Sequence, residues 1–141
     1  MTTDPRLKAS LLLDVPFGVS DLVSLRPAVA AHASEAGMDN HQLNVLVFIA
    51  YELATNAVHH GGGRGRLRLW RNETDLLCEV SDEGQGLPQE MKTPVQPPLG
   101  ATKGRGLWLV YTFADAFSVS ANDGDALGTT IVATLRLSKQ D

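Results

Sequence analysis

The sequence has few of the features that stabilise a protein without a core or attach it to a membrane or a nucleic acid. Cys78 is the only cysteine among the 141 residues, so no disulfide can form within the chain. With 12 Lys and Arg against 16 Asp and Glu, the net charge of −4 argues against a basic face for DNA or RNA. The longest apolar run, VLVFIAY at 45–51, is far too short to span a bilayer, and the N-terminus shows no secretory signal. We therefore expect a cytoplasmic protein that contacts neither membrane nor nucleic acid directly.

What the sequence does contain is a series of helix-like and strand-like patterns, and its length predicts a single domain over residues 1–141. The predicted strands lie at 9–15, 66–71, 76–82, 117–123 and 128–137. The predicted helices lie within 20–37, from Asp39 or Asn40 to the glycines at 61–63, and at 107–116. Because the helices are segregated from consecutive strands, we expect an α+β two-layer sandwich with a mixed or antiparallel sheet.

The second predicted helix is apolar nearly all round, which is typical of a central, buried helix, yet it carries a polar stripe. Glu52 and Asn56 are four residues apart and share one face, and His59 and His60 continue the stripe to the helix end. The stripe could simply face solvent. The alternative is a magnesium site, with an oxygen ligand for a hard cation and a carboxylate beside it as a base. The two histidines have no partner pattern for zinc.

Two glycine-containing segments follow. In SDEGQG, at 81–86, a carboxylate stands at a strand end, and Gly84 and Gly86 would let a flat ligand approach the backbone. In GATKGRGLWLV, at 100–110, two glycines and two basic residues precede a helix, where free N–H groups and the helix dipole favour an anion. An ordinary turn and a glycine-rich loop are the alternatives. The aromatic residues Trp108, Tyr111 and Phe113 are expected in the core.

The order of these segments is more specific than any one of them. ELATNAVHHG, DEGQG, GRGL and GTTIVATL resemble the N, G1, G2 and closing G-T boxes of the Bergerat-fold (GHKL) superfamily of gyrases, heat-shock chaperones and histidine kinases. Within it, the chain looks most like anti-sigma factor serine/threonine kinases and stand-alone histidine-kinase-like ATPase domains. The resemblance implies the Bergerat ATP-binding fold, with a mixed sheet and three main helices.

The resemblance also implies a role for each matching residue, with ATP and Mg²⁺ as cofactors. Glu52 would be the base that polarises the attacking hydroxyl or water, and Asn56 would hold Mg²⁺. Asp82 would bind the adenine amine, and the segment 88–103 would be the ATP lid. The other residues implied to contact ATP are His60, Gly84, Gly86, Lys103, Gly104, Arg105, Gly106, Leu107 and Thr129. His59 has no counterpart.

The leading functional hypothesis is an ATP-binding regulatory protein of the anti-sigma type. Such a kinase would bind a sigma factor, phosphorylate a serine or threonine of an anti-anti-sigma factor, and form a homodimer. Two alternatives stay open: a catalytically idle ATP-binding module, and a detached histidine-kinase catalytic domain acting on a separate protein. The short, proline-rich lid departs from many histidine kinases. His32 is expected to be an ordinary helix residue, and no upstream helix offers a phosphoacceptor histidine.

Overall fold

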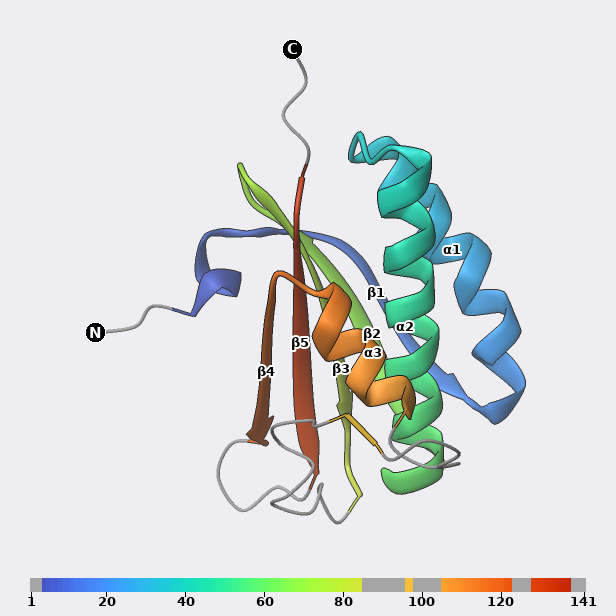
Figure 1. Ribbon diagram of the computed structural model, residues 1–141. Helices are drawn as coiled ribbons and strands as arrows, with labels where there is room; N and C mark the ends of the chain where they lie inside the picture. The colour runs from blue at the N-terminus through green and yellow to red at the C-terminus, as the bar shows by residue number, and fades with distance from the viewer. Residues whose placement is uncertain (1–3, 85–95, 98–104, 123–127, 138–141) are drawn as a thin grey trace.

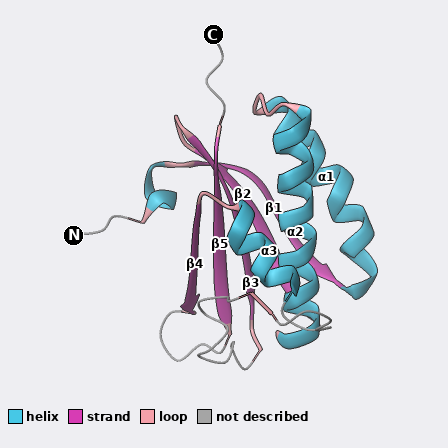
Figure 2. Cartoon of the chain, in the orientation of Figure 1, coloured by secondary structure: helices cyan, strands magenta, loops and turns pink. Residues whose placement is uncertain are grey.

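The structure is a computed structural model that describes residues 4–84, 96–97, 105–122 and 128–137, and within these residues it is a two-layer α+β sandwich (Figures 1 and 2). The described helices are α1 (Leu22–Glu35), α2 (Asn40–His60), α3 (Arg105–Phe113) and the short 3₁₀ helices η1 (Pro5–Lys8) and η2 (Val19–Asp21). The described strands are β1 (Ser10–Gly18), β2 (Arg64–Arg71), β3 (Asp75–Asp82), β4 (Ala116–Ala121) and β5 (Thr129–Arg136). In the described part of the chain, no helix is long and apolar enough to span a membrane.

The five described strands form one sheet in the order β1-β2-β3-β5-β4, and every pairing is antiparallel. The α+β sandwich is confirmed, whereas the mixed sheet implied by the resemblance is wrong for these strands. The connections explain this. The chain turns directly from β2 into β3. Between β1 and β2, the helices α1 and α2 run out and back, so β2 starts at the end of the sheet where β1 finishes, with Gly18 opposite Arg64. Strands β3 and β4 run parallel, but β5 lies between them, so no parallel pair is hydrogen-bonded.

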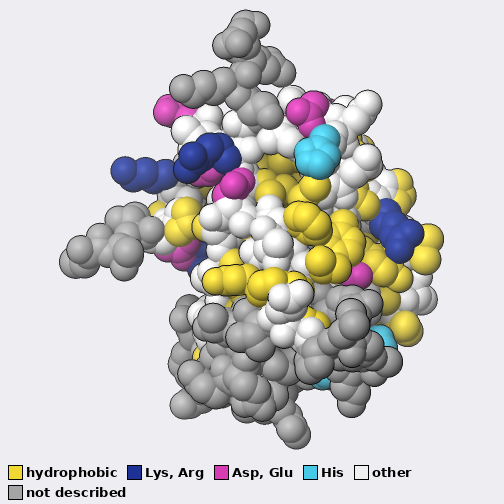
Figure 3. Space-filling model, in the orientation of Figure 1, with side chains coloured by type: hydrophobic (Ala, Val, Ile, Leu, Met, Phe, Trp, Pro, Cys, Tyr) yellow, Lys and Arg dark blue, Asp and Glu magenta, His cyan; other side chains and the backbone are white. Residues whose placement is uncertain are grey.

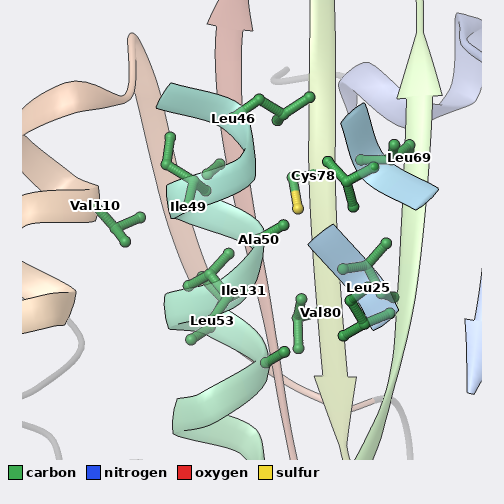
Figure 4. Packing of buried hydrophobic residues seen from close by; sticks show 14 of the residues in the cluster. Leu25, Leu46, Ile49, Ala50, Leu53, Leu69, Cys78, Val80, Val110 and Ile131 are labelled. Atoms are coloured by element: carbon green, nitrogen blue, oxygen red, sulfur yellow. The ribbon is translucent and has the colours of Figure 1, made fainter. Parts of the chain in front are cut away.

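Helix α2 is the centre of the core, as its nearly continuous apolar sequence predicts. Leu46, Ile49 and Leu53 have no exposed surface, and α2 packs against α1, α3 and strands β2, β3 and β5. Figure 4 shows these side chains in one cluster with Cys78 and Val80 of β3 and Val110 of α3. Burial raises the pKa of the Cys78 thiol to about 12, so Cys78 is a small core residue.

The element boundaries follow the sequence closely, and the structure decides three further points. Asp39 caps α2, because its side chain accepts a hydrogen bond from the Gln42 backbone N–H at 2.8 Å. Strand β1 continues through Pro16, which an edge strand tolerates. Tyr111 and Phe113 are not core residues, because they are 41% and 50% exposed. Figure 3 shows hydrophobic side chains gathered on the surface over α2 and α3.

The three α-helices cover one face of the sheet (Figure 1). A buried carboxylate lies on the other face, because the residues on either side of it in β3 point into the helix-covered core. Glu79 of β3 is 3% exposed, and its Oε1 accepts a hydrogen bond from Arg6 Nη1 of η1 at 2.6 Å. Arg68 of β2 lies 3.5 Å from the other carboxylate oxygen. Arg6 also pairs with Asp4, and these carboxylates raise the pKa of Arg6 while Arg6 lowers the pKa of Asp4. The ion network thus attaches η1 to the sheet.

Candidate functional site

The predicted site segments come together at one end of the sheet (Figure 1). The C-terminal end of α2, the end of β3, the start of α3 and the start of β5 all lie at this end. Each of these four segments carries or adjoins a glycine at which an added Cβ atom would overlap another segment of the site. The contacts at these glycines define how the segments are held.

On one side of the site, Glu52 of α2 lies against the first turn of α3. A Cβ atom at Gly106 would overlap the Oε2 atom of Glu52 and would lie 3.0 Å from its Cδ. The three nearest atoms to that position all belong to Glu52. Gly106 therefore leaves the space that the carboxylate occupies, and Glu52 is half-buried there. The polar stripe faces another helix at this point and does not simply face solvent.

Asn56 is one turn further along the same face of α2 and is also half-buried. His59 and His60 occupy the last turn of the helix and are exposed. Among the described residues, no group of three or more His, Cys, Asp and Glu side chains is placed to hold a metal ion. A single amide oxygen from Asn56 is the ligand that the sequence assigns, and the phosphates of a nucleotide would supply others.

On the other side of the site, Asp82 at the end of β3 packs on the end of α2. A Cβ atom at Gly61, which caps α2, would overlap the Asp82 carboxyl group. A Cβ atom at Gly84 would lie 2.5 Å from Gly61 Cα and 3.0 Å from the His60 carbonyl oxygen. The Gly84 N–H donates a hydrogen bond to Asp82 Oδ1 at 3.0 Å. Helix end, carboxylate and following turn therefore meet without intervening side chains.

This packing gives the first of the three glycines after α2 a role that the sequence pattern did not reveal. Gly61 has an ordinary negative φ of −111°, so its lack of a side chain serves the close approach to Asp82. The next two, Gly62 and Gly63, have φ values of +86° and +89°, a region that favours glycine. The run of three glycines is therefore required for packing and for the turn into β2.

Strand β5 begins beside Asp82. Thr129 is 4% exposed, and the preceding Gly128 lies so close to the Asp82 carbonyl oxygen that a Cβ atom there would overlap it. Leu107 of α3 is buried in the core at 7% exposure. Several residues of the predicted site lie outside the described part of the chain: Gly86, Lys103, Gly104 and the side chain of Arg105. The same holds for the predicted lid at 88–103, apart from Gln96 and Pro97.

With this geometry, the chain can be compared with known proteins. The family model described as the histidine kinase-like ATPase domain matches residues 15–135, and the chain belongs to this family. The match runs from β1 through β5 and so includes every described site segment. Membership of an ATPase domain family implies ATP as the ligand, which agrees with the predicted nucleotide. No curated protein sequence matches the chain.

Solved structures share the fold at low sequence identity. The catalytic domain of the histidine kinase ThkA superposes with a TM-score of 0.53 at 15% identity, covering 91% of this chain and 99% of that one. The mycobacterial sensor histidine kinase MprB gives 0.51 at 15% identity, covering 89% and 100%. Full-length ShkA, solved in complex with AMPPNP, gives 0.53 at 16% identity, covering 92% of this chain and 32% of that one. These likenesses establish the fold alone.

Proposed function

We propose that the protein is an ATP-dependent serine/threonine kinase of the anti-sigma type, which transfers the γ-phosphate of ATP to a partner protein. The observation that carries the proposal is the position of Glu52 against Gly106 at the start of α3. In a domain of this ATPase family, that position puts a carboxylate beside the helix N-terminus that would bind the phosphates. A base is therefore available where phosphoryl transfer would occur.

The described residues fit an adenine nucleotide with Mg²⁺. Gly61 and Gly84 let the end of α2 and the turn after β3 pack directly at Asp82, because a Cβ atom at either glycine would overlap its neighbour. The carboxylate of Asp82 can accept a hydrogen bond from the exocyclic amine of adenine. Asn56 offers an amide oxygen of the kind that Mg²⁺ binds. When bound, Mg²⁺ would neutralise phosphate charge and favour the departure of ADP from the γ-phosphoryl group of ATP.

The chain's own residues then have separable tasks. Asp82 orients the adenine ring. The first backbone N–H groups of α3 bind phosphate oxygens at the positive end of the helix dipole. Glu52 accepts the proton of the attacking hydroxyl as the oxygen–phosphorus bond forms and the bond to ADP breaks. Lys103 and Gly104, which precede α3 in the sequence, and Arg105, its first residue, would add positive charge and N–H donors, as the family resemblance implies.

A carboxylate base supports a hydroxyl acceptor over an imidazole. A serine or threonine hydroxyl must lose its proton as it attacks, whereas a neutral histidine ring already presents a lone pair. For this reason we propose serine/threonine transfer ahead of transfer to histidine. The proposed partners are a sigma factor and an anti-anti-sigma factor in the cytoplasm, bound by a homodimer.

The first experiment measures binding of a non-hydrolysable ATP analogue to the purified protein with and without Mg²⁺. The wild type should bind, and Asn56→Ala should lose most of the increase in affinity that Mg²⁺ provides. Glu52→Gln should bind the analogue as well as the wild type does. Glu35→Gln, at the exposed end of α1, is a matched control that should change neither measurement. A wild type that binds no nucleotide would refute the site assignment as a whole.

The second experiment follows phosphate from labelled ATP to a serine-containing anti-anti-sigma protein. Glu52→Gln should lower the rate by about 10²- to 10⁴-fold, the usual contribution of a general base. An acid-stable phosphoprotein would support a serine or threonine acceptor, and an acid-labile one would instead favour phosphohistidine. Nucleotide binding with neither transfer nor hydrolysis above the Glu52→Gln level would mean that the domain is a catalytically idle module.

A further inference from the structure

A side chain at the end of strand β4 contacts Asp82, the residue proposed to bind adenine, although β5 lies between β4 and β3. Asn122 follows β4 directly, and its Nδ2 donates a hydrogen bond to the backbone carbonyl oxygen of Asp82 at 2.7 Å. In the sheet, β5 separates β4 from β3, so this contact joins two strands that are not neighbours. The ladder between β3 and β5 ends at Ser81 and Thr130, one residue before Asp82. Asn122 therefore satisfies a carbonyl that has left the ladder.

A second hydrogen bond holds the Asn122 side chain in place, and the Asp82 carbonyl, which can only accept, decides which way its amide points. The Thr130 hydroxyl of β5 donates to Asn122 Oδ1 at 2.8 Å. With the oxygen held by Thr130, the amide nitrogen is the atom that faces the Asp82 carbonyl. The opposite orientation would place two acceptor oxygens against each other and lose the bond to Asp82, although the Thr130 hydroxyl could then accept from the amide nitrogen. Thr130 and Asn122 together form a pair that only an amide side chain can complete.

Gly128 leaves room for the hydrogen bond between Asn122 and Asp82 because it has no side chain. A Cβ atom there would lie 2.8 Å from Asn122 Nδ2 and would overlap the Asp82 carbonyl oxygen. The φ of Gly128 is +111°, which also favours glycine. The backbone N–H of Asn122 donates to the Gly128 carbonyl oxygen at 3.2 Å, so both ends of the connection are fixed. The Asn122 side chain thus passes over Gly128, where any other residue would obstruct it.

We propose that Asn122, oriented by Thr130, is a positioning residue for adenine recognition. It fixes the backbone of Asp82, while the Gly84 N–H holds one carboxylate oxygen of the same residue. Backbone and side chain of Asp82 are then both constrained, as a residue that selects one base requires. The inference rests on the proposed function, since it assigns to Asp82 the adenine contact. It predicts an effect on base selectivity and none on phosphate binding.

The test compares the dissociation constants of ATP and inosine triphosphate, which carries an oxygen in place of the exocyclic amine. Asn122→Asp keeps the shape of the side chain but replaces the donor by an acceptor. It should weaken ATP binding by about five- to tenfold, the size of one hydrogen bond, and should change inosine triphosphate binding less than about twofold. Equal losses for the two nucleotides, or no loss for either, would overturn the inference.

Milder variants keep the test decisive if Asn122→Asp does not fold. Thr130→Val removes the hydroxyl at constant shape and should lower the preference for ATP, whereas Thr130→Ser should retain it. Thr134→Val, on the same face of β5, is the matched control and should leave the preference unchanged. A Thr130→Val protein with wild-type preference would refute the role. A wild type that binds neither nucleotide would instead refute the proposed function and remove the basis of this inference.

Discussion

The contact between Gly106 and Glu52 predicts a variant that loses activity without losing its fold. In Gly106→Ala, the new methyl group occupies the position of the Glu52 carboxylate. The obstructing atoms are the far end of a flexible side chain, so Glu52 can rotate away. A side chain about 30° from its preferred rotamer costs about 0.5–1.5 kcal/mol. Alanine in place of glycine in a helix returns up to about 1 kcal/mol. We therefore expect the free energy of unfolding to change by less than about 1 kcal/mol.

If Glu52 is the base that we propose, the catalytic consequence should be much larger, because its carboxylate must leave its position. A displacement of about 1 Å at a reacting group can cost about 10²-fold in rate. Gly106→Ala should thus transfer phosphate about 10²-fold more slowly than the wild type while its urea unfolding curve stays near that of the wild type. Gly84→Ala is the informative contrast. Its methyl group meets the backbone of Gly61, which cannot rotate away, so it should lose about 1–3 kcal/mol of stability.

A double-mutant cycle isolates the contact without relying on activity. In a Glu52→Ala background the obstruction is gone, so Gly106→Ala should be neutral or stabilise the protein by up to about 1 kcal/mol. Gly18→Ala, where no atom lies closer than 3.9 Å to the new Cβ, should have the same effect in both backgrounds. The reasoning would be refuted by wild-type transfer rates in Gly106→Ala, or by a cost of Gly106→Ala that is equal with and without Glu52.

Two further predictions concern the sheet. Arg6→Met should lower the free energy of unfolding by about 1–3 kcal/mol in a urea titration, because the buried Glu79 carboxylate loses its hydrogen-bond partner at 2.6 Å. Adding Glu79→Gln should restore part of that loss. A double variant that is no more stable than Arg6→Met would contradict the prediction. Cys78 should react with a thiol reagent at pH 8 only as fast as the protein unfolds. Fast labelling of the native protein would contradict this. Because the pKa of Cys78 is about 12 in the fold against an ordinary 9.0, the free energy of unfolding should fall as pH rises between these values, and Cys78→Ala should show a smaller fall.

The sequence allowed the fold and the principal site segments to be predicted because both depend on local patterns. Apolar periodicity located the helices and strands, and the spacing of Glu52 and Asn56 places them on one helix face wherever that helix lies. Contacts between distant segments leave no such local pattern. The role of Gly61 depends on Asp82, and that of Asn122 depends on a strand order in which β5 separates β4 from β3. The exposure of Tyr111 was missed for the same reason, since it depends on which face of α3 meets the core.

The packing of α2 explains why its polar stripe must face the start of α3. Leu53 follows Glu52 directly, and Ala57 follows Asn56; both apolar residues are buried in the core. Adjacent helical residues point about 100° apart, so the buried pair fixes the direction of the polar pair. With α1, α3 and the sheet all packed on α2, the helix cannot rotate to expose Glu52 without exposing Leu53. A half-buried carboxylate needs compensation from a partner or ligand. The structure thus holds Glu52 at the site by core packing, which is the arrangement that a fixed catalytic base requires.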